Sequence, residues 1–483
     1  MARRPGRMQQ LMVSGFTKLD PKWLPFADAA TTELPLGRIL RLGLFQLAVG
    51  MAAALLTGTL NRVMIVELHV PTTLVAVMVS IPLLVAPFRA FLGFRSDTHR
   101  SALGWRRVPF IWFGSLIQFG GLAIMPFALI LLSGDTHGSV AAARTMAALA
   151  FLLVGAGAYV TQTAGLALAN DLAPERVRPR IVALLYIMLL LGIVCSSLIF
   201  GLLLQNFSQL KLIKVVQGAA MVTMVLNMIA MWKQEPRTPM SRTEVTEPRP
   251  RFRDAWRVFI AGGDAIRLLV VVALGTFAFN MQDVLLEPYG AQILGLSVSA
   301  TTSLTAIFSA GSILAFAFAG RVLLRGTDAG RLTAAGVLIG AVGFAAVVFA
   351  APLSSAMLFR AGTALIGFGE GLFAVGTLTF AMNLPDAAQH GIALGAWGAV
   401  FAVSEGLALA SSGLLYDVLA PLSRAGRFGV ALSAPSVPYS VVYHAEVALL
   451  FVTLVALGPL VAPLGAARRV TRRAKFGLAD LPG

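Results

Sequence analysis

The sequence predicts an all-α polytopic membrane protein with twelve transmembrane helices in two pseudo-symmetric six-helix halves. Three observations predict it: the apolar composition, the number and length of the apolar runs, and the position of Lys and Arg between those runs. Of the 483 residues, 57% are hydrophobic and only 12% are charged, and the mean hydropathy is +0.81. Soluble domains carry about 25% charged residues, so lipid must cover much of this surface. The single cysteine excludes a disulfide-stapled secreted fold.

Twelve apolar runs are long enough to cross a bilayer as helices, because a hydrocarbon layer of ~30 Å needs about 20 residues. None of them alternates in polarity as a barrel strand does. In chain order the predicted spans are 42–66, 72–92, 108–132, 145–168, 181–204, 214–232, 267–290, 299–323, 332–353, 357–381, 392–415 and 441–464.

The spans divide the chain into five parts. An N-terminal segment (1–41) precedes a first half (42–232), a proline-rich charged linker (233–266), a second half (267–464) and a tail (465–483). With this division, 31 of the 38 Lys and Arg residues lie on the side of both termini, which the positive-inside rule makes cytoplasmic. The net charge of +16 therefore reflects membrane orientation and not nucleic-acid binding. The halves echo each other, and this indicates an internal duplication.

Polar and ionisable side chains inside spans are functional candidates, because lipid penalises them. The predicted spans carry Asn61, Arg62, Gln282, Asp283, Glu287, Arg360, Glu370, Glu405, His444 and Glu446. A pseudo-two-fold axis brings the ends of spans one and seven together, so we predict an ion pair between Arg62 and Asp283, serving either as a structural clasp or as part of a ligand site. Glu370 lies among glycines and is either a proton-coupling carboxyl or a neutral acid bonded to a helix carbonyl. No catalytic motif is present, so we expect no enzyme.

Two loops carry motifs of a known superfamily. The segment from Gly93 to Asp97, followed by Gly104-Trp105-Arg106-Arg107, resembles the signature between spans two and three of the major facilitator superfamily. The segment from Asp171 to Arg176 resembles that superfamily's second cytoplasmic latch. The resemblance implies a latch at the cytoplasmic helix ends, whereas the alternative is a solvated basic loop. The latch candidates are Gly93, Asp97, Arg106, Arg107, Asp171 and Arg176.

A longer string in span seven is more specific. Residues 277–290 read FAFNMQDVLLEPYG, residues 60–68 read LNRVMIVEL, and residues 87–90 and 104–109 read PFRA and GWRRVP. These strings resemble the PucC/LhaA family, the bacteriochlorophyll-delivery branch of the major facilitator superfamily. The resemblance implies an assembly factor that delivers bacteriochlorophyll to light-harvesting antenna polypeptides, with the core antenna favoured over the peripheral antenna.

The resemblance also implies partners and a compartment. The partners are the light-harvesting α and β polypeptides, the bacteriochlorophyll-synthesis machinery and the protein translocon, in the intracytoplasmic photosynthetic membrane of a bacterium. The candidates for contact with pigment or partner are Asn61, Arg62, Gln282, Asp283, Glu287 and Tyr289. His69 and His444 are weaker candidates for ligation of the pigment magnesium, the alternative being hydrogen-bonded histidines at span edges.

Two other functions remain open from the residues alone. One is a proton-coupled transporter of a small solute that uses Arg360, Glu370 and Glu405. The other is a non-catalytic subunit of a bacteriochlorophyll-synthesis complex.

Overall fold

The computed structural model describes residues 35–85, 105, 107–133, 139–173, 178–235, 263–382, 390–429 and 432–461. Over these residues the chain forms helices and no strand. Eleven helices are long and apolar enough to cross a membrane, and a shorter apolar helix, Thr72–Leu84, occupies the place of the second predicted span. The remainder of that span, together with Gly93, Asp97, Arg106 and Arg176, lies outside the described residues.

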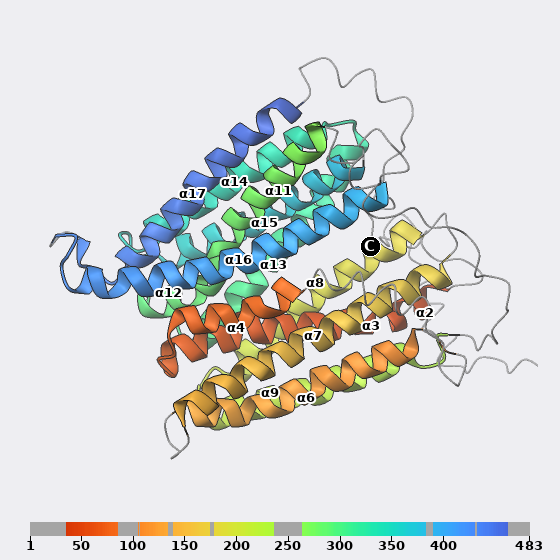
Figure 1. Ribbon diagram of the computed structural model, residues 1–483, viewed down its shortest axis with the longest axis horizontal. Coiled ribbons are helices and arrows are strands. Elements are labelled where there is room, and N and C mark those ends of the chain that lie inside the picture. Colours follow the sequence, from red (N-terminus) through yellow and green to blue (C-terminus); the bar gives the residue numbers. More distant parts are fainter. Residues whose placement is uncertain are drawn as a thin grey trace, which may run out of the picture.

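The helices form two bundles that follow each other along the chain (Figure 1). The first contains α2 (Leu36–Leu42), α3 (Leu44–Ala53), the π-helical segments η2 (Ala54–Leu60) and η3 (Val63–Glu67), α4 (Thr72–Val85), α6 (Val108–Leu132), α7 (Val140–Leu172), α8 (Arg178–Leu203) and α9 (Gln209–Met231). The second contains α11 (Gly263–Asn280), the 3-10 segment η6 (Met281–Val284), α12 (Leu286–Gln292), α13 (Val298–Leu324), α14 (Ala329–Ala350), α15 (Ala356–Met382), α16 (His390–Arg424), α17 (Val437–Leu457) and η9 (Gly458–Leu460).

Helix packing repeats between the halves. In the first half α3 contacts α8 and α9, and α6 contacts α7 and α9. In the second half α11 contacts α16 and α17, and α14 contacts α15 and α17. The same relative positions are therefore in contact in each half, as the predicted duplication requires.

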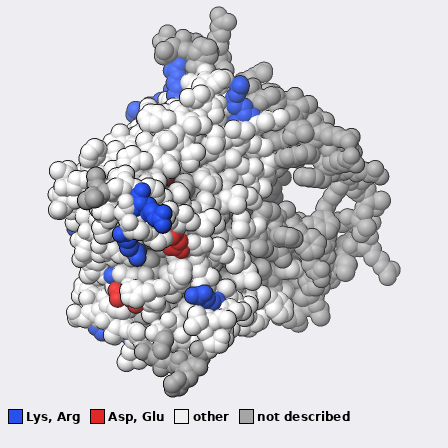
Figure 2. All heavy atoms as spheres, turned by 60° about the vertical axis from the view of Figure 1, so that its left-hand side comes forward, with Lys and Arg blue, Asp and Glu red and all other residues white. Residues whose placement is uncertain are grey.

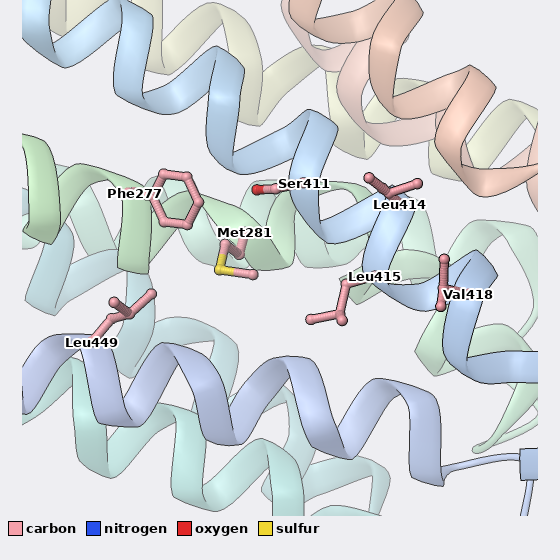
Figure 3. Close-up of a pocket in the computed structure, with 7 residues that line it drawn as sticks. All are labelled: Phe277, Met281, Ser411, Leu414, Leu415, Val418 and Leu449. Carbon is pink, nitrogen blue, oxygen red and sulfur yellow. The ribbon is translucent and has the colours of Figure 1, made fainter. Parts of the chain in front are cut away.

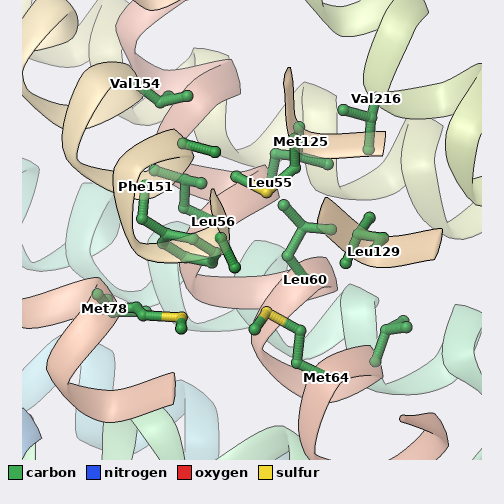
Figure 4. Close-up of a cluster of buried hydrophobic side chains, with 14 of the residues drawn as sticks. Leu55, Leu56, Leu60, Met64, Met78, Met125, Leu129, Phe151, Val154 and Val216 are labelled. Carbon is green, nitrogen blue, oxygen red and sulfur yellow. The ribbon is translucent and has the colours of Figure 1, made fainter. Parts of the chain in front are cut away.

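The halves meet mainly along two helix pairs, α4 with α16 and α8 with α13, and span one adds contacts of η2 with α13 and of η3 with α12. Gly413 lets α16 approach α4 closely, because a Cβ there would lie 2.5 Å from the Cβ of Ala76. The hydrophobic core of the first half, which includes Leu60, Met64 and Phe151 (Figure 4), continues across this interface to Leu409. The two halves therefore share part of one core.

We call the two ends of the molecule the α12 end and the termini end. At the α12 end, span one finishes at Glu67 and α4 begins at Thr72; at the termini end, α2 begins and η9 finishes. On the face in Figure 2, which looks toward the left-hand side of Figure 1, charged residues lie in a group near the middle and at the upper edge, and most of the described surface carries none. Large apolar side chains are exposed on the molecule, among them Phe127, Leu202 and Val455. This surface suits lipid.

Several helices extend beyond their predicted bounds. The first predicted span, 42–66, is part of a longer helical run from Leu36 to Glu67, and α16 continues to Arg424, nine residues beyond the predicted end at 415. A helix can leave the hydrocarbon layer without ending, so hydropathy locates the membrane crossing and not the helix terminus.

Candidate functional site

Spans one and seven are both irregular where their polar residues lie. In span one, the π-helical segments η2 and η3 flank Asn61 and Arg62. In span seven, α11 ends at Asn280 and the 3-10 segment η6 holds Gln282 and Asp283. Irregular backbone inside a membrane protein is concentrated at functional sites, because it changes side-chain direction and frees backbone polar groups. We call Asn61, Arg62, Gln282, Asp283 and Glu287 the crossing site.

Asn61 joins the two broken helices directly. It is 1% exposed, and its Nδ2 donates to the carbonyl oxygens of Asp283 and Val284 at 3.3 and 3.0 Å. The 3-10 geometry of η6 interrupts the α-helical hydrogen-bond ladder, and the carbonyls at such a break need partners from elsewhere. A side chain from the first half thus supplies the donor that the second half lacks.

The predicted ion pair between Arg62 and Asp283 is wrong. Arg62, which is 4% exposed, forms its ion pair with Glu67, with Nη1 and Oε1 2.5 Å apart. Glu67 lies five residues after Arg62, and the π-helical turn stacks residues at that spacing, so local geometry provides the partner. The Asp283 carboxylate instead accepts a hydrogen bond from the amide of Gln282.

Glu287 lies where span one passes α13. It is 3% exposed, and its Oε1 accepts a hydrogen bond from Thr305 Oγ1 at 2.6 Å. Gly58 makes room for this contact, because a Cβ there would lie 2.8 Å from Thr305 Oγ1 and 3.0 Å from Glu287 Oε1. Glu287 is therefore enclosed at a helix crossing.

Four carboxylic acids approach one another within the second half. Asp283, Glu370 and Glu405 are half-buried, and Glu446 on α17 is fully buried. Asp283 is close enough to the other three for their charges to interact. Asn280 donates from Nδ2 to Glu370 Oε1 at 3.2 Å. Within the described part of the chain, neither carboxyl oxygen of Glu446 has a hydrogen-bond partner. We call these four residues the acid cluster.

Other candidates lie apart from the crossing site. Tyr289 belongs to an aromatic core, with its ring 5.3 Å from that of Tyr439 and its hydroxyl donating to the Val347 carbonyl at 3.2 Å. Arg360 is half-buried near the start of α15. His444 is exposed on α17, and His69 is exposed at the end of span one with a φ of +52°. The described residues contain no group of three or more His, Cys, Asp or Glu that could hold a metal ion.

The described part of the predicted latch pairs Arg107 with Asp171, with Nε and Oδ2 3.0 Å apart. Glu235 adds a contact that sequence reasoning missed. Its carboxylate accepts from the backbone N–H of Arg107 and of Val108, the latter at 3.0 Å, so it caps the first turn of α6.

A second missed residue joins the halves at the α12 end. Asp417 on α16 accepts from the backbone N–H of Thr72 at 3.2 Å and of Thr73 at 2.7 Å. Thr73 Oγ1 also donates to the Gly413 carbonyl at 3.3 Å. Asp417 therefore caps the first turn of a helix in the other half. Its signal in the sequence was a charge close to an apolar run, but it lies two residues beyond the predicted end of that span.

Known proteins resemble this chain over most of its length. The family model described as PUCC protein matches residues 59–464. A Rhodobacter capsulatus relative named "Uncharacterized protein in puhA-bchM intergenic region" is 54% identical over 463 residues, covering 95% of this chain and 97% of the relative. "Protein PucC" of Rhodovulum sulfidophilum is 51% identical over 418 residues, covering 86% of this chain and 92% of the relative.

Solved structures share the fold. A bacterial homologue of the human lysosomal transporter Spinster, in an inward-facing and unoccupied conformation, superposes with a TM-score of 0.66 at 15% identity, covering 87% of this chain and 95% of that one. This similarity confirms the predicted fold of the major facilitator type. Because the family model and these relatives span nearly the whole membrane body, the chain belongs to the PucC family.

Proposed function

We propose that this protein is an assembly factor for the photosynthetic light-harvesting antenna, which delivers bacteriochlorophyll to the antenna polypeptides within the membrane. Membership of the PucC family supports the antenna role. We propose the core antenna α and β polypeptides as clients and the pigment-synthesis machinery as the source. The proposed location is the intracytoplasmic photosynthetic membrane, with both termini cytoplasmic, near the translocon that inserts the clients.

One observation supports pigment handling most directly. A cavity of about 400 Å³ opens between α11, η6, α16 and α17 (Figure 3). Leu414 and Val418 at its mouth are 54% and 49% exposed, so it opens to the surface of the bundle. Its lining residues are Phe277, Met281, Ser411, Leu414, Leu415, Val418 and Leu449. This volume and apolar character fit a part of a hydrophobic ligand.

The cavity lining and the crossing site are adjacent in the sequence. Met281 lines the cavity, and Gln282 and Asp283 follow it in η6. A ligand with a hydrocarbon tail and a polar head fits this order, with the tail against Met281 and the head toward the half-buried Asp283. Bacteriochlorophyll, when bound, supplies the magnesium macrocycle that the antenna takes up. The protein's part is to shield the apolar tail and to offer oxygen atoms to the head.

The first test is spectroscopic. The full chain, purified in mild detergent from pigmented membranes, is expected to carry near-stoichiometric bacteriochlorophyll in its near-infrared spectrum and to bring antenna polypeptides with it. A deletion strain should lose the core antenna band more than the peripheral band. Absence of pigment from the purified chain, together with unchanged antenna bands, would contradict the proposal.

A double variant tests the polar residues. Asp283→Asn with Glu287→Gln should lower pigment co-purification at least tenfold if the span-seven face holds the head. Asp328→Asn is the matched control, because Asp328 caps α14 within one half, by accepting from the N–H of Arg331 at 3.0 Å. Equal amounts of pigment in both variants would contradict a role of Asp283 and Glu287 in holding the polar head of the pigment.

The acid cluster supports a second function, proton-coupled transport of a small solute. Four carboxylic acids within one half can exchange protons with one another, and the fold is one that transporters use. Proteoliposomes with an imposed proton gradient would then accumulate the solute, and Glu370→Gln would abolish accumulation. Purified protein without pigment would favour this function. Co-purification of a pigment synthase without antenna chains would instead favour the synthesis-complex subunit.

A further inference from the structure

An imidazole lies on the outward face of α17, where the other exposed side chains are apolar. His444 is the eighth residue of this helix, about 10 Å from its start at a rise of 1.5 Å per residue. On the same face Val441 is 42% exposed, Phe451 55% and Val455 78%. Figure 1 shows α17 at the outer edge of the second half. A polar ring that faces lipid needs a partner for its free nitrogen.

The shortest contact of the ring indicates which nitrogen is free. His444 Nδ1 lies 2.6 Å from the carbonyl oxygen of Ser440, one turn earlier on the helix, and 3.3 Å from the Ser440 hydroxyl. A carbonyl can only accept a hydrogen bond, so the tautomer that makes the shorter contact has its proton on Nδ1 and its lone pair on Nε2. Among the described residues, no donor contacts Nε2. Metal-binding histidines have this arrangement, in which a backbone acceptor holds one ring nitrogen and the other binds the metal.

A single nitrogen ligand restricts the kind of metal. A free ion in a protein takes four or more ligands, and the described residues contain no cluster that supplies them. A metal already chelated by a planar macrocycle needs only one axial ligand from the protein. Residues one turn away on either side, Ser440 and Ala448, are small, so a flat macrocycle can lie over the helix surface between Val441 and Phe451.

We propose that His444 is the axial ligand of a magnesium tetrapyrrole that docks from the lipid onto the outward face of α17. This proposal rests on the proposed function, which supplies the class of ligand, but it uses a surface separate from the crossing site. Nε2 donates its lone pair to the magnesium, no bond breaks, and the Ser440 carbonyl keeps the ring oriented. The pigment reaches this face laterally, without passing between the halves.

The test uses the full chain in lipid nanodiscs, with bacteriochlorophyll a as the probe and bacteriopheophytin a, its metal-free form, as the comparison. Titration by absorbance gives affinity, and the visible band that is sensitive to axial ligation gives the coordination state. His444→Leu should weaken bacteriochlorophyll binding at this site at least tenfold and should leave bacteriopheophytin binding unchanged. Val455→Leu is the matched control, because it changes an exposed apolar side chain on the same face of α17 and removes no nitrogen ligand.

A cavity variant separates ligation from packing. His444→Gly should lose the nitrogen-ligated spectrum and regain it when 1-methylimidazole is added, since the small base can replace the missing ring. An unchanged ligation spectrum in both His444 variants would overturn the proposal while leaving pigment delivery intact. Failure of the unmodified chain to bind bacteriochlorophyll would overturn the proposed function and this proposal together. Monodisperse elution of each variant establishes that it is folded.

Discussion

The contact between Asp417 and α4 predicts how firmly the α12 end is closed. The carboxylate accepts from the N–H groups of Thr72 and Thr73, two of the donors that a helix start leaves unpaired. Asparagine has the same shape but only one acceptor oxygen and no charge, so Asp417→Asn leaves one donor without its bond and removes the attraction to the helix dipole. For a half-buried group we expect a loss of about 1.4 kcal/mol, at the upper end of the range of about 0.5–1.5 kcal/mol for a typical hydrogen bond.

That loss corresponds to about a tenfold shift in the equilibrium between the closed and open α12 end. An end that is open in about 1% of molecules becomes open in about 10%. The assay is a distance distribution between spin labels on Val140→Cys and Phe428→Cys, in a chain whose lone exposed Cys195 is replaced by Ser. Asp328→Asn serves as the control, because it removes the same kind of cap within one half. Identical distributions for Asp417→Asn and the control would refute the reasoning.

Two further predictions concern packing and charge. Gly58→Val should lower the midpoint of thermal unfolding, with a cost of about 1–3 kcal/mol for overpacking, whereas Gly120→Ala should not, because a Cβ at Gly120 meets nothing within 4 Å. Glu67→Gln should reduce accumulation in membranes because it leaves the buried Arg62 unpaired, and the swap Arg62→Glu with Glu67→Arg should restore it. The swap Arg62→Asp with Asp283→Arg should not restore accumulation, and recovery there would contradict the pairing.

Hydropathy predicted the membrane body because the free energy of placing an apolar run in lipid depends on composition alone. Each predicted span has a helix at its place in the described residues, and the pseudo-two-fold relation correctly brought the ends of spans one and seven together. The end of α16 was wrong because a helix does not have to stop where the hydrocarbon does, and this error hid Asp417.

The pairing inside the site could not be predicted in the same way. Asn61 was a candidate for contact with pigment or partner, and its contact with span seven is made through backbone carbonyls that the 3-10 geometry of η6 leaves without helical partners. Arg62 was assigned a distant partner, because an α-helical reading places Glu67 on another face. The π-helical turn brings Glu67 onto the same face as Arg62, and no residue type in the segment predicts a π-helix. Local backbone geometry decided both contacts.

The contacts between the halves bear on how cargo moves. Within the described residues, hydrogen bonds between the halves join Asn61 to the η6 carbonyls and join Asp417 and Thr73 across α4 and α16. A typical hydrogen bond contributes about 0.5–1.5 kcal/mol. A cargo that prefers the open state by a few kcal/mol can therefore separate this end. Delivery along the outward face of α17 needs no such separation. An Asp417→Asn chain that opens more often yet loads antenna at the normal rate identifies a lateral carrier, whereas one whose loading rate changes with opening identifies a route between the halves.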